Sequence, residues 1–276
     1  MRISVIVPSK GCTRLKYLFL GLKEQSIRPS EVILVLKGCN VKRVEDLCGT
    51  YGLPCAIIEQ ERGYFTHALN MGKREADGDL LVFTDDDAIP PRRWLERWIK
   101  YHELYRRAAG ISSRDFYLDL SSFRIFPTPD DLSYIKLYRW LIRPLLEKPH
   151  PLLKKYRLGV YITRNYSVAH GPYIPSKTCY SLPFRGVNMS FKAEYVYDVW
   201  FPEHPLLKRA SGNEQYFGLQ LILKGYDTIY VPHNPVLHIA RRGSLSRTKR
   251  RSEVRVEAGI MREFYKKLLK SSVLSI

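Results

Sequence analysis

The first 83 residues alternate short apolar runs with segments of helical periodicity, and this alternation limits the fold more than any other feature. Four runs rich in β-branched and aliphatic residues predict buried strands, at residues 2–7, 31–36, 55–58 and 80–83. Helical spacing of apolar side chains predicts helices between them, at residues 15–25, 41–48 and 64–76. Strands that alternate with helices favour a parallel sheet with right-handed crossovers. We therefore predict an α/β fold with a mostly parallel, Rossmann-like sheet flanked by helices.

Three adjacent aspartates, Asp85, Asp86 and Asp87, follow the strand predicted at 80–83 almost at once. Neighbouring carboxylates repel one another, so a cation is expected beside them, and a hard divalent ion with oxygen ligands is the simplest candidate. The carboxyl end of a strand is also where open α/β sheets bind their ligands. The alternative is a solvated acidic turn that caps the next helix, which we expect from Arg92 onward.

The net charge of +18 over 276 residues indicates a polyanionic neighbour: nucleic acid, an anionic membrane surface or a phosphorylated substrate. The five cysteines are odd in number and contain no Cys-x-x-Cys pair, so we expect reduced thiols rather than a zinc ribbon or a disulfide framework. The sequence contains no apolar run long enough to cross a bilayer and no signal peptide. These features together predict a cytoplasmic protein.

The middle of the chain, roughly 112–180, is rich in aromatic residues and proline. Within it, residues 137–148 interleave Trp140 and several leucines with Arg139, Arg143 and Lys148. Such a segment could lie in a membrane interface, but an amphipathic helix on a protein core is commoner, and we favour the helix. Further on, residues 215–223 predict a helix and 228–231 a strand. The basic tail has an apolar stripe that predicts a last helix, formed by Val254, Ala258, Met261, Tyr265 and Leu268.

Six short motifs occur in an order that resembles the family-2-like glycosyltransferases, which have the GT-A fold and use a nucleotide-sugar donor. The motifs lie at residues 4–8 (SVIVP), 63–79, 84–90 (TDDDAIP), 186–191 (GVNMSF), 212–226 and 231–238. Each motif is weak by itself, whereas six in the same order are specific. The resemblance implies a nucleotide-sugar-binding half at 1–110 and an acceptor-binding, catalytic half at 111–240. Residues 241–276 then form a basic tail with an amphipathic helix.

The same resemblance assigns residues to the donor and to a metal. Asp85 and Asp87, with His238, would hold Mn²⁺ or Mg²⁺, while Asp85 or Asp86 would contact the donor ribose; the ligating pair within the three aspartates stays open. The other implied donor contacts are Pro8, Ser9, Arg62, Arg241 and Arg242. Arginine suits the last two positions because its guanidinium binds diphosphate oxygens in a bidentate manner. The alternative for this pair is a solvated or nucleic-acid-facing basic run.

On the acceptor side the resemblance implies that Asn188 and Met189 contact the acceptor and that Glu214 is the catalytic base. Glu214 stands where the family usually has the aspartate of a Glu-Asp pair, and Asn213 replaces the first carboxylate. An inverting transferase needs such a base to deprotonate the acceptor hydroxyl. The alternative is that Glu214 only stabilises the N-terminus of a helix through the helix dipole.

Two departures from the family pattern refine the expected function. Lys37 occupies the position of an aspartate that reads the nucleobase, and lysine cannot accept a hydrogen bond, so the donor base stays open. The Gln-x-x-Arg-Trp signature of processive synthases is absent. This absence argues against a processive synthase. The resemblance then implies a metal-dependent, inverting transferase of hexosyltransferase type that moves one sugar to a glycan or lipid-linked acceptor. It would contact the inner membrane face through its tail. The alternative is a non-catalytic nucleotide- or nucleic-acid-binding module.

Overall fold

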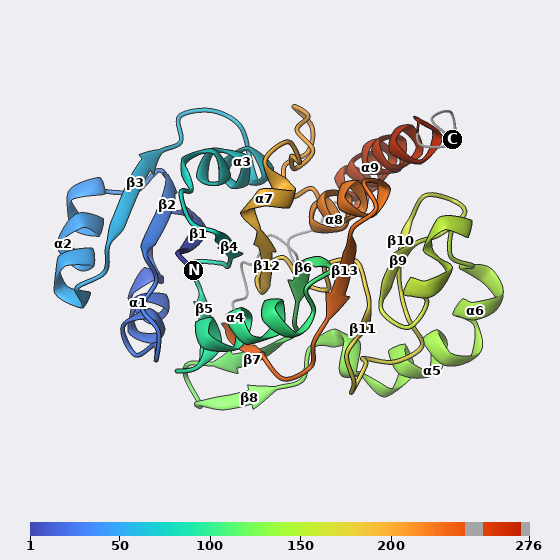
Figure 1. Cartoon of the computed structure of the whole chain (residues 1–276), viewed down its shortest axis with the longest axis horizontal. Coiled ribbons are helices and arrows are strands. Elements are labelled where there is room, and N and C mark those ends of the chain that lie inside the picture. The colour runs from blue at the N-terminus through green and yellow to red at the C-terminus, as the bar shows by residue number, and fades with distance from the viewer. Residues whose placement is uncertain (241–250, 272–276) are drawn as a thin grey trace.

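The computed structural model of the chain describes residues 1–240 and 251–271 (Figure 1). Its centre is an eight-stranded sheet with the strand order β11-β13-β6-β12-β4-β1-β2-β3. These strands are β1 (Ile3–Lys10), β2 (Glu31–Lys37), β3 (Cys55–Glu59), β4 (Leu80–Phe83), β6 (Ala108–Ser112), β11 (Cys179–Tyr180), β12 (Met189–Lys192) and β13 (Asp227–Tyr230). Neighbouring strands run parallel except where β12 meets β4 and β6 and where β11 meets β13. The predicted, mostly parallel sheet is confirmed.

Helices cover both faces of this sheet. On one face lie α1 (Leu15–Lys23), α2 (Val41–Tyr51) and α4 (Trp94–Leu104); on the other lie α3 (Phe65–Glu75), α7 (Ala193–Val196) and α8 (Asn213–Leu223). Because successive strand residues point to opposite faces, Val5 and Val7 pack with the first set and Ile6 with the second. Gly72 lets α3 approach closely, since a Cβ there would lie 2.5 Å from Ile6 Cγ2.

A second, four-stranded sheet has the order β5-β14-β7-β8 and is built from β5 (Ala88–Ile89), β7 (Asp115–Asp119), β8 (Arg124–Phe126) and β14 (Val236–Ile239). In it β14 lies between β5 and β7, so that His238 is opposite Ala88 on one side and Tyr117 on the other. Since Ala88 directly follows the three aspartates, this pairing brings residue 238 beside them. The small sheet therefore joins three segments that are far apart in the sequence.

The last helix, α9 (Arg251–Ser271), packs against α8 and closes a third apolar cluster with β9 (Val160–Ile162), β10 (Val168–His170) and the 3-10 helix η2 (Pro151–Tyr156). Within the predicted apolar stripe, Met261 and Tyr265 are buried, while Val254 is exposed. The Tyr265 hydroxyl donates a hydrogen bond of 2.5 Å to the carbonyl oxygen of Gly212, directly before α8. The predicted helix is confirmed, and it supports the N-terminus of α8.

Residues 137–148 do not form the predicted helix on the protein core. The structure instead has the 3-10 helix η1 (Pro129–Asp131) and two helices, α5 (Ser133–Leu141) and α6 (Arg143–Leu146), with Pro144 in the first turn of α6. The apolar residues of α5 point outward, since Trp140 is 64% exposed, whereas Arg139 is 5% exposed. The prediction was wrong because Arg139 forms an ion pair with Asp130 on the inner side, which the spacing of apolar residues cannot reveal.

The expectation of five reduced cysteines was also wrong. Disulfides join Cys12 to Cys39, with Cα atoms 5.6 Å apart, and Cys48 to Cys55, with Cα atoms 6.2 Å apart, while Cys179 is a free thiol. The first pair forms because β1 and β2 are parallel neighbours whose following loops meet. Disulfides persist mainly in oxidising compartments, so the cysteines no longer support a cytosolic location. Among the described residues no helix has the length and apolar character needed to cross a membrane.

Candidate functional site

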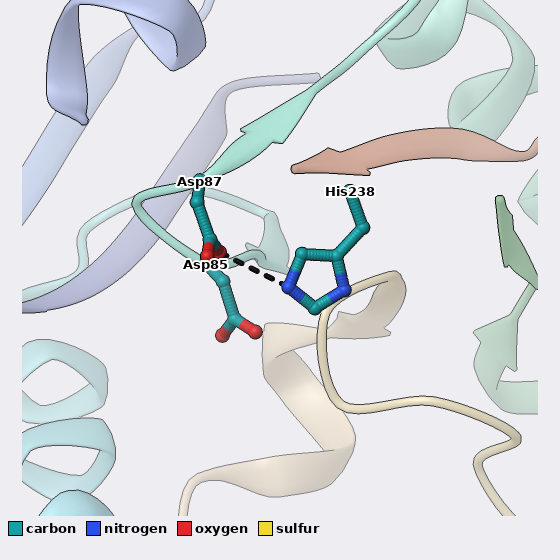
Figure 2. Close-up of side chains that lie close together, drawn as sticks. All are labelled: Asp85, Asp87 and His238. Atoms are coloured by element: carbon teal, nitrogen blue, oxygen red, sulfur yellow. Dashed lines mark ion pairs between the residues drawn. The ribbon is translucent and has the colours of Figure 1, made fainter. Parts of the chain in front are cut away.

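The three aspartates lie in the turn between β4 and β5, and their side chains divide between two directions. Asp86 is buried, and its Oδ2 accepts a hydrogen bond of 2.5 Å from the hydroxyl of Ser9 on the adjacent strand β1. Asp87 is fully buried and Asp85 is half-buried, and both carboxylates lie beside the imidazole of His238 (Figure 2). Asp86 is therefore fixed toward the sheet, and its two neighbours face β14.

His238 contacts a carboxylate through each of its ring nitrogens. Its Nε2 is 3.1 Å from Oδ1 of Asp87, and its Nδ1 is 3.0 Å from Oδ2 of Asp115 on β7. Desolvation lowers the pKa of this imidazole, but the hydrogen bonds to Asp115 and Asp87 outweigh it and raise the pKa to about 10. The ring is consequently protonated at neutral pH when no cation is bound.

Asp85, Asp87 and His238 each offer one ligand atom, and these atoms all lie within 4.8 Å of one another. Two carboxylates and an imidazole form a donor set that suits a divalent ion such as Mn²⁺. A ligating histidine usually donates its second N–H to a carboxylate, and Asp115 accepts that hydrogen bond from Nδ1. The residues present therefore fit a divalent ion, with Nε2 as the ligating nitrogen.

Sequence reasoning missed Asp115 and its neighbour Arg185. Burial raises the pKa of Asp115, but the hydrogen bond with His238 and the charge of Arg185 outweigh it and hold that pKa below its usual range. Arg185 Nε lies 3.5 Å from Oδ1 of Asp115, and the same guanidinium pairs with Asp130. The need of a metal-binding histidine for a carboxylate partner is the one signal that could have pointed to Asp115, but it does not say which strand supplies it.

Glu214 lies in the first turn of α8, after Gly212, whose φ of +98° suits glycine. The backbone of Gly186 leaves room beside its carboxyl group, since a Cβ on Gly186 would lie 3.8 Å from Cδ of Glu214. Desolvation raises the pKa of Glu214, and the charge of Arg185 acts against this rise. Arg185 thus contacts Asp115 and also acts electrostatically on the candidate base.

The other residues expected to bind the donor are found in different settings. Pro8 is buried within β1, and Arg62 is exposed in the loop between β3 and α3. Lys37 Nζ donates a hydrogen bond of 2.6 Å to the carbonyl oxygen of Gly63 and so ties the end of β2 to this loop. Arg241 and Arg242 lie outside the described residues. The structure therefore brings Ser9, the aspartates and His238 together, while Arg62 lies on a neighbouring loop.

Asn188 and Met189, which we expected to contact the acceptor, are in the interior. The side-chain oxygen of Asn188 accepts a hydrogen bond of 2.9 Å from the indole N–H of Trp94. Its side-chain nitrogen donates to the carbonyl oxygens of Arg114 and Asn234 at 2.9 and 2.8 Å. Met189 has no exposed surface and packs in the core. Both residues thus hold β12 in place, and neither side chain reaches the surface.

Solved structures with a similar fold come from glycosyltransferases. The chain aligns with Staphylococcus aureus TarS 1–349 in complex with UDP-GlcNAc at a TM-score of 0.58 and 14% identity, covering 99% of this chain and 72% of that one. It aligns with GalNAc-T7 bound to UDP, GalNAc and Mn²⁺ at a TM-score of 0.63 and 13% identity, covering 87% and 44%. It also aligns with S. aureus TarS at a TM-score of 0.51 and 15% identity, covering 87% of this chain but 37% of that one. At these identities the likeness shows the GT-A fold alone.

A sequence comparison identifies the family. Residues 4–150, just over half of the chain, match glycosyl transferase family 2, and this range includes the aspartate turn but not Glu214 or His238. No curated protein sequence matches the chain. The matched range includes the alternating strands and helices that lead to the three aspartates and extends through α6, and the remainder completes the GT-A sheet. The chain therefore belongs to glycosyl transferase family 2.

Proposed function

We propose that the protein transfers a single hexose from a nucleotide-sugar donor to a glycan or lipid-linked acceptor, with inversion and with the help of Mn²⁺ or Mg²⁺. In this proposal residues 1–110 bind the donor and residues 111–240 bind the acceptor. The observation that carries it is the convergence of Asp85, Asp87 and His238 from β4 and β14. The donor class is supported by the similar structures, which were solved with UDP, UDP-GlcNAc and, for GalNAc-T7, Mn²⁺.

A divalent ion held by Asp85, Asp87 and His238 would offset the negative charge that develops on the departing diphosphate. The chain's own residues prepare the site for that task. Asp115 keeps the Nδ1 proton of His238 in place and leaves Nε2 toward the two aspartates. The hydrogen bond from Ser9 keeps the side chain of Asp86 toward the sheet, so that it points in a different direction from the carboxylates of Asp85 and Asp87.

Glu214 is the proposed base, and its environment supports this role. Burial raises the pKa of its carboxyl group, which makes the carboxylate a stronger base for the proton of an acceptor hydroxyl. The nearby charge of Arg185 acts against this rise in pKa and favours the ionised carboxylate. The base comes from α8 and the metal ligands come from β4 and β14, which is compatible with a single displacement between two opposed groups.

The donor's nucleobase and the place of action belong to the same proposal. Lys37 cannot read a base as an aspartate would, and its amino group is engaged by Gly63, so we leave the base unspecified. We propose that the transferase works at a membrane face where lipid-linked acceptors are exposed. A thermal-shift screen of nucleoside diphosphates and their sugars, with and without Mn²⁺, identifies the donor because a ligand that binds the folded state raises Tm.

Hydrolysis of the nucleotide sugar found in that screen tests the proposal. We expect Mn²⁺-dependent hydrolysis by the wild-type protein, its loss in Asp85→Asn, and normal rates in Asp46→Asn, an exposed aspartate on α2 that serves as the matched control. Equal rates in both variants would contradict the metal site. Nucleotide binding without turnover under any metal would favour the non-catalytic binding module instead.

A further inference from the structure

The helices α5 and α6 form the edge of the molecule opposite α2 and β3 (Figure 1). A helix on a protein core buries its apolar side chains, whereas α5 exposes them and buries Arg139. Tyr134, Leu137 and Leu141 follow one another at helical spacing and are exposed, as is Trp140. On α6, which packs beside α5, Leu145 is 75% exposed and Leu146 is exposed too. We call these six residues the apolar lobe; contiguous exposed apolar patches of this kind usually mark an interaction site.

The charges around the apolar lobe are of one sign. Residues 121–164 contain three carboxylates, and each is paired with an arginine: Asp130 with Arg139 and Arg185, Asp131 with Arg114, and Glu147 with Arg143. The exposed charged residues of the same segment are all basic, namely Arg124, Lys136, Lys148, Lys154, Lys155, Arg157 and Arg164. Lys155 pairs with Asp227, which lies outside this segment. The lobe therefore combines apolar and aromatic side chains with an excess of exposed basic residues.

We propose that the apolar lobe docks on an anionic lipid bilayer and inserts its leucines and Trp140 into the headgroup region. Apolar side chains flanked by lysine and arginine are the composition that binds such interfaces, and tryptophan and tyrosine are enriched there. Basic residues beside the lobe add attraction to anionic headgroups. A second copy of the chain is a poorer occupant, because it would bring two sets of mostly positive charges together.

The ion pairs behind the lobe connect it to the acceptor side of the candidate site. Asp130, directly before α5, pairs with both Arg139 and Arg185. Arg185 in turn contacts Asp115 and acts on the pKa of Glu214. A bilayer bound to the lobe would thus lie on the side of the molecule that carries the proposed base. That a lipid-linked acceptor is presented there depends on the proposed function, whereas the docking itself does not.

The test is co-sedimentation of the full chain with vesicles of phosphatidylcholine mixed with phosphatidylglycerol, and with vesicles of phosphatidylcholine alone. We expect binding to the mixed vesicles and much weaker binding to the neutral ones. The variant L137S/W140S/L145S should bind about tenfold or more weakly, since three inserting side chains are lost. The matched control L104S/Y197S/L206S replaces three exposed apolar residues elsewhere, which are 69%, 74% and 54% exposed, and should bind like the wild type.

Fluorescence gives a second readout. The emission of Trp140 should shift to the blue on addition of mixed vesicles, and this shift should be absent from W140F although W140F still binds. The proposal is overturned if L137S/W140S/L145S binds vesicles as the wild type does, if the wild type binds neither kind, or if that variant converts a wild-type dimer to a monomer.

Hydrolysis of the soluble donor separates this inference from the proposed function. All lobe positions lie outside the candidate site, so L137S/W140S/L145S should hydrolyse the donor normally. Vesicle binding by a protein that hydrolyses no nucleotide sugar would refute the proposed function and still support the docking surface.

Discussion

The carboxylates of Asp115 and Glu214, which both feel the charge of Arg185, differ in the direction of their pKa shifts. Burial dominates at Glu214 and raises its pKa, whereas hydrogen bonding to His238 and the charge of Arg185 outweigh burial at Asp115 and lower its pKa. Groups whose environments separate their pKa values in this way often have different chemical roles at one site. Glu214 is suited to take up a proton, and Asp115 to stay ionised as the partner of an imidazole.

Replacing Glu214 with glutamine should lower kcat by about a hundred- to ten-thousand-fold, because the acceptor proton loses its base. The Kd of Mn²⁺ should not change, since Glu214 is not among the ligating residues. Glu214→Asp should retain part of the activity, because its carboxylate is one methylene farther away. A Glu214→Gln enzyme with wild-type kcat would show that the residue only stabilises α8.

The pH profile of the wild-type enzyme gives an independent check on Glu214. A protonated carboxyl cannot accept a proton, so kcat/KM should fall as the pH decreases through the pKa of Glu214. Because burial raises that pKa, the fall should begin above the range of an exposed glutamate. The acidic limb should be missing from the residual activity of Glu214→Gln; the same limb in both enzymes would assign it to another group.

Asp115→Asn should weaken Mn²⁺ binding by about ten- to a hundredfold, because His238 loses the carboxylate that orients its ring. The loss of the free Mn²⁺ signal in electron paramagnetic resonance measures this directly, without any turnover. Asp119→Asn is the matched control on the same strand, since Asp119 accepts hydrogen bonds from Ser121 and Ser122 instead. Unchanged affinity in Asp115→Asn would remove the residue from the metal site.

Among the helices and strands, local periodicity predicted those whose pattern is contained in a short segment of sequence. The strands and helices from β1 to β4 match their predicted positions within a few residues, because alternation and helical spacing are properties of short segments. The small sheet β5-β14-β7-β8 was not predicted, since β14 pairs with β5 and β7 across more than a hundred residues. The outward orientation of the apolar side chains of α5 was also missed, because it depends on the Arg139–Asp130 ion pair.

The residues of the candidate site also fall into two groups, those found from the sequence and those seen only in the structure. Resemblance to a family singled out Asp85, Asp87, His238 and Glu214, and the structure places ligand atoms of the first three within 4.8 Å of one another. Asp115 and Arg185 belong to no motif and became visible only when β7 paired with β14. Asn188 was selected for its place in a motif, although its side chain is used to tie β12 to α4.

The two disulfides should stabilise the loops beside the donor strands to different degrees. Loss of a disulfide typically costs about 2–4 kcal/mol of unfolding free energy, and more when the closed loop is longer. The C12S/C39S variant, which opens a sequence separation of 27, should therefore lose more stability than C48S/C55S, which opens a separation of 7. Urea unfolding without reductant measures both; wild-type stability in each variant would mean that the cysteines do not pair in solution.

The contact between α9 and α8 should matter to both stability and activity. Tyr265→Phe removes one of two hydrogen bonds to the carbonyl oxygen of Gly212, which keeps the backbone N–H of Tyr216 as a donor, and this loss should cost about 0.5–1.5 kcal/mol. Because Gly212 directly precedes Asn213 and Glu214, kcat should fall as well. Tyr197→Phe, at a 74% exposed position, is the matched control for unfolding and kinetics. A Tyr265→Phe variant indistinguishable from this control would separate α9 from the candidate site.

In the whole molecule, the two larger sheets bring together side chains that are far apart in the sequence. The aspartate turn, β7 and β14 form one end of the candidate site, and α8 supplies the proposed base. The basic composition is also organised, because in residues 121–164 every carboxylate is paired and the exposed charges are positive. The net charge could be counted from the sequence, whereas the grouping of exposed basic residues with the apolar lobe could be seen only in the structure.

Mn²⁺ binding, followed by electron paramagnetic resonance over a range of pH, is the decisive test of the metal site. We expect one Mn²⁺ per wild-type chain and none at comparable affinity in Asp85→Asn. It also predicts an affinity that rises about tenfold per pH unit near neutrality, because the ion displaces the proton of His238, whose pKa is about 10. Equal Mn²⁺ binding by Asp85→Asn, or an affinity independent of pH, would contradict a metal site formed by Asp85, Asp87 and His238.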